Sequence, residues 1–195
     1  MSFSAPAHCT PVPLAKAYRL MNHGPVVLVS SAHGGTSNVM AAAWSMPLDF
    51  DPPKVTVVID KATLTRQLVE ASGVFGLNIP CVAMAAQTLA VGTDSARTVP
   101  AKLAQHGITT FTASQIAAPL VQSCVAWLEC RVLPEPHNQG QYDLFIAEVL
   151  AAWADERVFS DGRWHFDAAP DALRTLHYVA GGQFYATGQS LQVAI

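Results

Sequence analysis

Charged side chains are scarce in this sequence: they make up 13% of its 195 residues, against about 25% in an average soluble domain. Lysine and arginine are scattered and the net charge is −3, so no basic stripe indicates nucleic-acid binding. A domain of this size normally exposes much surface that charge has to cover. We therefore expect a second copy to cover part of it, in a homodimer, the commonest soluble oligomer.

Long apolar runs are absent as well. Each one is interrupted by Pro, Gly, Asp or Arg well before the roughly 18 residues that a membrane span needs. The N-terminus lacks the basic region and apolar block of a secretory signal. The cysteines, Cys9, Cys81, Cys124 and Cys130, show neither C-x-x-C spacing nor a disulfide framework. We expect a cytoplasmic protein that does not contact a membrane.

Common catalytic and metal-binding motifs are also missing. The seven histidines are dispersed, without H-x-H or H-E-x-x-H spacing, so we expect no metal site. No G-x-S-x-G or G-x-G-x-x-G motif occurs, which disfavours a hydrolase and a standard dinucleotide-binding domain. No side chain stands out as a catalytic acid, base or nucleophile.

Extended segments dominate what is present. A hairpin is predicted from Pro25–Ser31 and Ser37–Ser45, joined by turn residues at 33–36. Further extended segments are predicted at 54–59, 74–80, 122–134 and 142–155, with a break at 49–53 and a turn at 134–140. Helical segments are predicted at 14–20, 63–72, 82–92, 101–106 and 171–178. This pattern suits one domain over residues 1–195, an antiparallel barrel with inserted helices and terminal arms of about 20 and about 10 residues.

The second arm of the predicted hairpin is unusual because it carries three consecutive alanines, Ala41–Ala43. Alanine is a poor choice for a strand that only fills a core. Small side chains leave the backbone accessible, so a flat group could lie against this strand.

A second candidate site is the segment Asp60–Arg66, where a predicted strand ends and a helix begins. Unpaired N–H groups and the helix dipole favour an anion there, and arginine suits a phosphate. On the residues alone, a simpler interpretation is the more frequent one: Thr63 caps the helix, and Lys61 and Arg66 are solvated.

Several motifs together resemble the flavin reductase-like family of FMN-binding split barrels, which includes flavoredoxin and NAD(P)H:flavin oxidoreductases. The motifs are the Asn-x-Met-small-small run from Asn38, the Phe-x-x-Asn at Phe75, the segment 118–132 and the closing segment 177–185. They occur in the family's order over roughly residues 20–185. The resemblance implies a mainly β fold with inserted helices, an antiparallel, Greek-key-like FMN-binding split β-barrel.

The resemblance also implies an activity, hydride transfer from NADH or NADPH to the flavin. FMN is the expected flavin and FAD the alternative, and no residue that would read the nicotinamide ribose is identified. Reduced flavin would pass electrons to a partner monooxygenase, a metal ion, a disulfide or oxygen. Two alternatives stay open: an FMN-binding electron carrier without NAD(P)H turnover, and a split barrel that has lost flavin and binds another ligand.

The resemblance implies that the flavin contacts the strand at 38–45, the start of the helix at 61–66, and one residue each of a later loop and a short helix. The implied cofactor-binding residues are Asn38, Val39, Met40, Ala41, Ala42, Ala43, Trp44, Ser45, Lys61, Thr63, Thr65, Arg66, Ser95 and Lys102. Relatives usually carry Thr or Ser where this chain has its alanines, so backbone groups rather than hydroxyls are expected to contact the flavin there.

Overall fold

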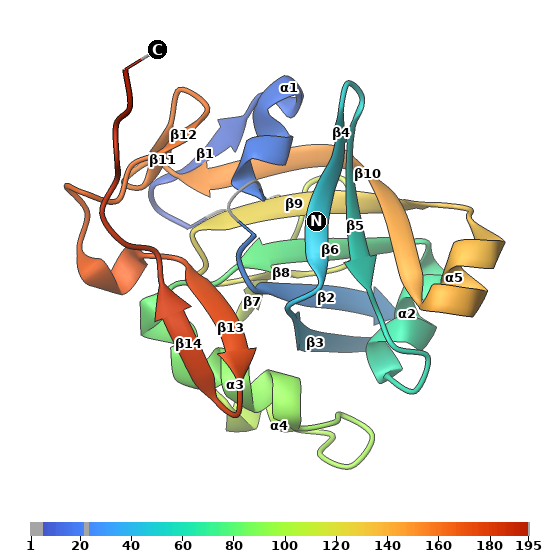
Figure 1. Ribbon diagram of the computed structural model, residues 1–195. Coiled ribbons are helices and arrows are strands. Elements are labelled where there is room, and N and C mark those ends of the chain that lie inside the picture. The colour runs from blue at the N-terminus through green and yellow to red at the C-terminus, as the bar shows by residue number, and fades with distance from the viewer. Residues whose placement is uncertain (1–5, 22–23, 195) are drawn as a thin grey trace.

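The computed structural model describes residues 6–21 and 24–194 and is dominated by antiparallel strands (Figure 1). The large sheet contains β1 (Cys9–Val12), β2 (Val27–His33), β3 (Thr36–Ala42), β4 (Ser45–Phe50), β5 (Pro53–Val58), β6 (Val74–Ile79), β9 (Ala126–Leu133) and β10 (Leu144–Asp155). Small two-stranded sheets pair β7 (Thr110–Phe111) with β8 (Leu120–Val121), β11 (Phe159–Ser160) with β12 (Arg163–Trp164), and β13 (Leu176–Ala180) with β14 (Gln183–Ala186). The helices are α1 (Leu14–Ala17), α2 (Leu64–Ser72), α3 (Ala85–Thr93), α4 (Lys102–Gln105) and α5 (Pro136–Tyr142), with 3-10 turns η1 (Tyr18–Leu20), η2 (Val82–Met84) and η3 (Asp171–Leu173).

The large sheet is a path of strands whose two ends adjoin in the chain. Its order is β3-β2-β6-β9-β10-β5-β4, and neighbours are antiparallel throughout. The end strands β3 and β4 are consecutive in the chain, joined only by Ala43 and Trp44. Such a link spans at most about 11 Å, so the two ends of the sheet must lie close together. The expected mainly β, antiparallel barrel is confirmed.

The predicted hairpin is also confirmed. β2 pairs with β3 from Val27 opposite Ala42 to His33 opposite Thr36. Gly34 and Gly35 form the turn with φ values of 57° and 79°, a region that glycine enters without steric cost. Two-residue turns of this kind match the twist of the strands that they join.

Helix α2 begins and ends where the sequence predicts. The Thr63 hydroxyl oxygen accepts a hydrogen bond from the Arg66 backbone N–H at 3.1 Å, and Gly73 ends the helix at φ 71°. The helix packs against β2 and β3, which brings its first turn beside the alanine-rich strand. The strands predicted near 54–59, 74–80, 122–134 and 142–155 and the helices near 14–20, 82–92 and 101–106 are present as well.

Other expectations need correction. β4 has no counterpart among the predicted strands, because Pro47 and Asp49 obscure its alternation. The turn expected at 134–140 contains α5, which Pro136 begins at a position where a missing N–H costs nothing. The helical turn expected over 171–178 is limited to η3, and the chain then forms the β13–β14 hairpin around Gly181 and Gly182.

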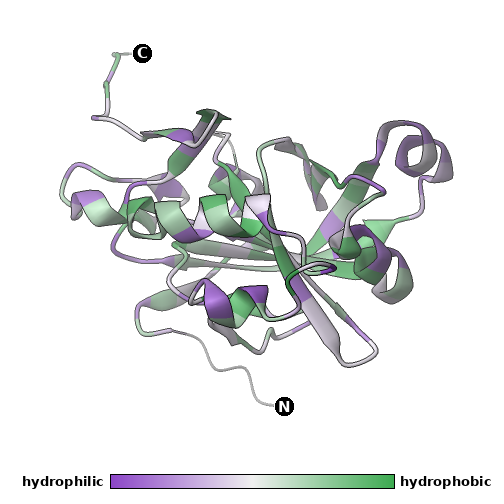
Figure 2. Ribbon diagram, turned by 90° about the horizontal axis from the view of Figure 1, so that it is seen from below, coloured by the Kyte–Doolittle hydropathy of each residue, from purple (hydrophilic) through white to green (hydrophobic). Residues whose placement is uncertain are grey.

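The barrel interior is apolar, and the strands are mostly green in the hydropathy view of Figure 2. Glu129 on β9 is an exception, because it is fully buried. Its carboxylate accepts hydrogen bonds from the N–H groups of Ser114 and Gln115 and from the indole of Trp153. These bonds fasten the loop before β8 to the barrel.

The two terminal segments differ. Residues of the expected N-terminal arm contribute β1, which pairs with β10 from Cys9 opposite Asp155 to Val12 opposite Ala152. After β14 the chain continues without helix or strand, and it is first held by hydrogen bonds from Arg174 to the carbonyls of Thr187 and Gly188 and from the Ser190 N–H to Asp167. Within 6–21 and 24–194, no helix is long and apolar enough to cross a membrane.

Candidate functional site

Two adjoining pockets lie between strand β3 and helix α3. The first, here called the polar pocket, has a volume of about 310 Å³ and is lined by Asn38, Met40, Ala41, Asp60, Ala62, Thr63, Leu64, Thr65, Val91, Gly92, Thr93, Asp94, Ser95, Ala96 and Lys102. The second, here called the hairpin pocket, has a volume of about 160 Å³ and is lined by Val26, Ala41, Ala42, Ala43, Thr88, Leu89, Gly92, Thr93, Tyr178 and Phe184. Ala41, Gly92 and Thr93 belong to both.

The two pockets meet where β3 and α3 approach most closely. A Cβ atom built on Gly92 would lie 3.1 Å from the Cβ of Ala41, a distance shorter than nine in ten real Cβ contacts. The run of alanines that the sequence shows on β3 therefore has a structural reason, because small residues on both elements allow this approach. Both residues of this contact line the polar pocket as well as the hairpin pocket.

Asn38 is the best-placed polar side chain of the polar pocket. It is buried on β3, and its amide nitrogen donates a hydrogen bond to the Thr65 hydroxyl at 2.9 Å. Its amide oxygen is buried and has no partner among the described residues. A buried acceptor without a donor costs free energy, so this oxygen marks a position where a ligand donor would be stabilised.

The first turn of α2 forms one wall of the polar pocket. Thr63, Leu64 and Thr65 line it, and the Thr63 hydroxyl bridges the Asp60 carbonyl and the Arg66 N–H. Backbone N–H groups in a first helical turn have no intrahelical acceptor, and the helix dipole favours an anion near them. This wall can hold an anionic group.

Lys102 closes the opposite side of the polar pocket from α4. It is 2% exposed, and its ammonium group donates to the carbonyls of Val91 and Asp94 at 3.1 and 2.8 Å. Burial lowers the pKa of Lys102, and the Asp94 carboxylate opposes that shift. The contacts satisfy carbonyls at the end of α3, so Lys102 fixes the turn that carries Ser95 into the pocket.

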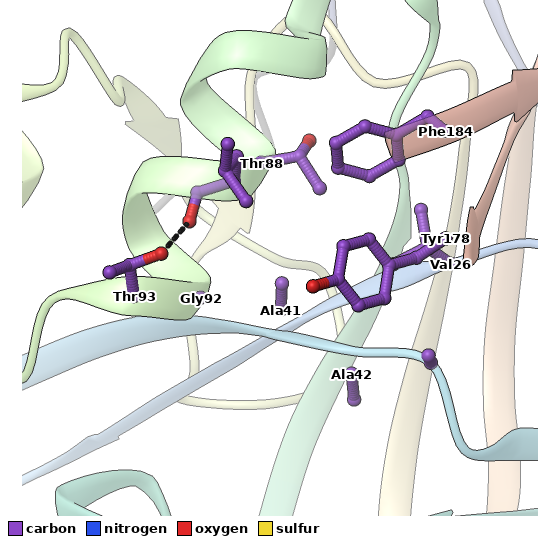
Figure 3. Close-up of a pocket in the computed structure, with 10 residues that line it drawn as sticks. Val26, Ala41, Ala42, Thr88, Gly92, Thr93, Tyr178 and Phe184 are labelled. Carbon is purple, nitrogen blue, oxygen red and sulfur yellow. Dashed lines mark hydrogen bonds between the residues drawn. The ribbon is translucent and has the colours of Figure 1, made fainter. Parts of the chain in front are cut away.

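The hairpin pocket has a different character. The rings of Tyr178 and Phe184, 5.2 Å apart, cover it from the β13–β14 hairpin, and Tyr178 turns its hydroxyl toward Ala41 (Figure 3). Thr88 lines it from α3, is 1% exposed, and its hydroxyl has no partner within the described part of the chain. By contrast, the Thr93 hydroxyl donates to the Leu89 carbonyl at 2.9 Å.

The structure thus brings together many of the residues that the sequence proposes as flavin contacts. Those at the polar pocket are Asn38, Met40, Ala41, Thr63, Thr65, Ser95 and Lys102. Ala42 and Ala43 line the hairpin pocket instead.

The remaining proposed contacts lie outside both pockets. Val39 points into the core, Trp44 is 75% exposed, and Lys61 is exposed beside α2 with its ammonium 4.0 Å from Asp143. The Ser45 hydroxyl is buried and, within the described chain, unpartnered. These positions adjoin the site without lining it.

Arg66 also lies outside the pockets, and its side chain bonds to other parts of the fold. Its guanidinium donates to Glu70, to Asp143, to the Ile59 carbonyl at 3.1 Å and to the Gln139 carbonyl at 2.9 Å. The group is buried and stacks on the Phe145 ring at 4.7 Å. It joins α2 to α5 and is not turned toward the polar pocket.

Sequence reasoning missed most residues of the hairpin pocket, among them Thr88, Tyr178 and Phe184. Tyr178 and Phe184 belong to the closing segment of the resemblance but received no role. Thr88 had a usable signal, because Gln87 and Thr88 are the only polar side chains between Val82 and Gly92.

Comparison with known proteins gives consistent matches. A model for the flavin reductase like domain matches residues 19–183. The uncharacterized protein YddH of Escherichia coli (strain K12) is 46% identical over 182 residues, which cover 92% of this chain and 95% of that protein.

Two solved structures are similar over most of the chain. An FMN-binding domain of a flavin reductases-like enzyme from Shewanella baltica OS155 has a TM-score of 0.94 at 54% identity, covering 95% of this chain and 97% of that one. Flavoredoxin of Desulfovibrio vulgaris (Miyazaki F) has a TM-score of 0.73 at 26% identity, with coverage of 88% and 90%.

The environment of Arg66 leads to a stability prediction. Replacing Arg66 with Met should lower the free energy of unfolding by about 3 kcal/mol, because one partner of a buried ion pair is removed. Urea unfolding monitored by circular dichroism measures this. Arg131→Met is the matched control, since Arg131 is exposed beside Glu148 and its pair is worth about 0–1 kcal/mol. Equal losses in the two variants would contradict the structural role of Arg66.

Proposed function

Because this chain belongs to the flavin reductase-like domain family and has its FMN-binding split-barrel fold, we propose that it binds FMN in the polar pocket and acts as a flavin-dependent oxidoreductase. The observation that carries the site is the unpartnered amide oxygen of Asn38, a buried residue that lines a pocket walled by β3 and the start of α2. The FMN-binding relative from Shewanella baltica supports the choice of FMN over FAD.

The residues of the polar pocket fit the different parts of FMN. The first turn of α2, with Thr63 and Thr65, suits the phosphate. Lys61 precedes this turn in the sequence, and we propose that its ammonium adds a positive charge beside the phosphate. The Asn38 oxygen can accept from a hydroxyl or N–H of the ligand. Met40 and Ala41 offer an apolar strand surface with accessible backbone against which a flat ring can lie.

Bound FMN would supply the hydride-accepting chemistry, so the protein has to bind, orient and shield it. No side chain of the polar pocket has to act as a general acid or base for hydride transfer. The main contribution of Asn38, Thr65 and Lys102 is position: the hydrogen bonds that these side chains make hold β3, α2 and the end of α3 in place.

The reductant that we propose is NADH or NADPH, and the final acceptor is a partner monooxygenase or a small oxidant. Likeness to flavoredoxin supports a second candidate, an FMN-binding electron carrier that does not itself oxidise NAD(P)H. The cysteines support a reducing, cytoplasmic setting, because the four thiols are free and Cys81, Cys124 and Cys130 are buried.

We further propose that the protein is a homodimer through the face of β4. This strand is an end of the sheet order, and its outward side chains Met46, Leu48 and Phe50 are exposed, Phe50 to 65%. Trp44 precedes them and is also exposed. An apolar stripe on an end strand associates readily, and a second copy would cover the same stripe by two-fold symmetry.

The flavin assignment is tested by titrating the purified protein with FMN and following flavin fluorescence. We expect saturable binding. Lys61→Ala and Thr65→Ala should each raise the Kd for FMN about tenfold, the factor expected when one hydrogen bond to a charged group is lost. Lys54→Ala is the control, because Lys54 pairs with Asp49 away from both pockets. Unchanged affinity in both site variants would reject the phosphate position, and no FMN uptake would reject the proposed function.

Turnover separates the two candidate functions. With FMN added, a flavin reductase should oxidise NADH or NADPH, followed as loss of nicotinamide absorbance, at a rate that rises with protein concentration. Flavin binding without such oxidation would favour the electron carrier.

The dimer is tested by light scattering coupled to size exclusion. The wild-type chain should have about twice its 20.7 kDa mass. Leu48→Asp should yield monomers, because a charge in a buried apolar interface has no partner. Gln67→Asp, on the exposed face of α2, should remain dimeric. A monomeric wild type would refute this proposal.

A further inference from the structure

The charges that line the polar pocket present a difficulty for an anionic ligand. Among the described residues that line it, Asp60 and Asp94 carry carboxylates, and Lys102 carries an ammonium that two carbonyls already engage. A phosphate monoester carries a charge of about −1.5 to −2 near pH 7, so an uncompensated carboxylate in the same pocket weakens its binding. Asp60 is exposed to solvent, which screens its charge. Asp94 is less exposed and needs another source of compensation.

His106 provides that compensation. Its Nε2 atom lies 2.6 Å from the Asp94 carboxylate, and the two side chains are 19% and 33% exposed. We propose that His106 is a positioning residue of the flavin site: it holds the Asp94 carboxylate and, when protonated, cancels its charge, so that the affinity for FMN depends on the charge of His106. This inference rests on the proposed function, because it needs an anionic ligand in the polar pocket.

Helix α4 holds Asp94 at two places. Lys102 donates to the Asp94 carbonyl at 2.8 Å, and His106, one turn later, reaches the carboxylate. The His106 backbone N–H donates to the Lys102 carbonyl at 3.0 Å, so one helical turn carries both side chains. Ser95 and Ala96 follow Asp94 directly and line the polar pocket. The position of this part of the pocket wall therefore depends on the pair of His106 and Asp94.

The charge of the pair changes in the pH range in which histidine titrates. The charged groups on the elements that hold the imidazole are Asp94 at the end of α3, Lys102 on α4, and the exposed Arg97 in the loop between these helices. Burial lowers the pKa of Lys102, and the Asp94 carboxylate opposes that shift. An imidazole changes from cationic to neutral between about pH 5 and 8. A neutral imidazole can still donate a hydrogen bond to Asp94, but it leaves the carboxylate charge uncompensated.

The test is the Kd for FMN, measured by flavin fluorescence at about pH 6 and about pH 8 in the wild type and in His106→Gln. The glutamine amide can still donate to Asp94 but carries no charge. We expect the variant to have about a fivefold higher Kd than the wild type at the lower pH, and a Kd within about twofold of it at the higher pH. The FMN phosphate also titrates in this range, but it does so in both experiments, so the ratio of the two Kd values isolates His106. The same ratio at both pH values overturns the proposal.

A second variant removes the other partner. Asp94→Asn lacks the carboxylate charge, so at about pH 8 it should bind FMN about fivefold more tightly than the wild type. An affinity at this pH equal to or below that of the wild type contradicts the role given to Asp94. His165→Gln is the matched control, because His165 is exposed and pairs with Ser160 at 3.0 Å beside the β11–β12 hairpin. It should have the wild-type Kd at both pH values.

Riboflavin, which lacks the phosphate, is the matched ligand. A charge effect acts on the phosphate, so the affinity for riboflavin should be the same in the wild type and in His106→Gln at both pH values. If the variant weakens riboflavin binding as much as FMN binding, the substitution distorts the pocket wall, and the charge role of His106 is refuted.

A third readout needs no flavin. In isotopically labelled protein without ligand, the amide signals of Ser95 and Ala96 should shift between about pH 6 and 8 in the wild type and not in His106→Gln. Signals that do not follow pH in this way overturn the positioning role. A wild type that binds no FMN rejects the proposed function and, with it, the effect on affinity. FMN binding with a pH-independent ratio of Kd values rejects only the inference about His106.

Discussion

The close approach of Gly92 to Ala41 is the constraint on which the candidate site depends. Either position would need its neighbour to move if it carried a larger side chain, because even a Cβ on Gly92 would come within 3.1 Å of Ala41. The approach brings α3 onto β3 and leaves a pocket on each side of the contact. The alanines of β3, poor residues for a strand, are thus explained by what lies beside the strand rather than by the sheet.

Some buried polar side chains are satisfied by the protein and others are not. Asn78 on β6 is satisfied on both sides: its amide nitrogen donates to the Leu28 carbonyl and its oxygen accepts from the Val121 N–H. Glu129 is likewise enclosed by donors. Asn38 and Thr88 each keep a buried oxygen without a partner in the described structure, and each lines a pocket. The hydroxyls of Ser31 and Ser45 are also buried and unpartnered among the described residues, and neither residue lines one of the two pockets, so the argument for Asn38 rests on its place in the pocket wall as well.

The sequence predicts the parts of the fold that local chemistry determines. Gly34–Gly35 specifies the hairpin turn, and Thr63 and Gly73 specify the ends of α2. It does not predict β4, whose outward residues Met46, Leu48 and Phe50 are apolar and exposed. Arg66 shows a related difficulty, because a cation in the first turn of a helix has the same local pattern whether it faces a phosphate or Asp143. Only tertiary packing distinguishes these cases.

The hairpin pocket could not be derived from sequence because its walls come from three distant segments. Val26 and the alanines belong to the β2–β3 hairpin, Thr88 to α3, and Tyr178 and Phe184 to a hairpin about ninety residues later. The β13–β14 strands pair with each other, and the Leu176 carbonyl of β13 accepts a hydrogen bond from the Val26 N–H next to β2. The pocket therefore combines side chains that lie far apart in the chain, and only tertiary packing brings them together.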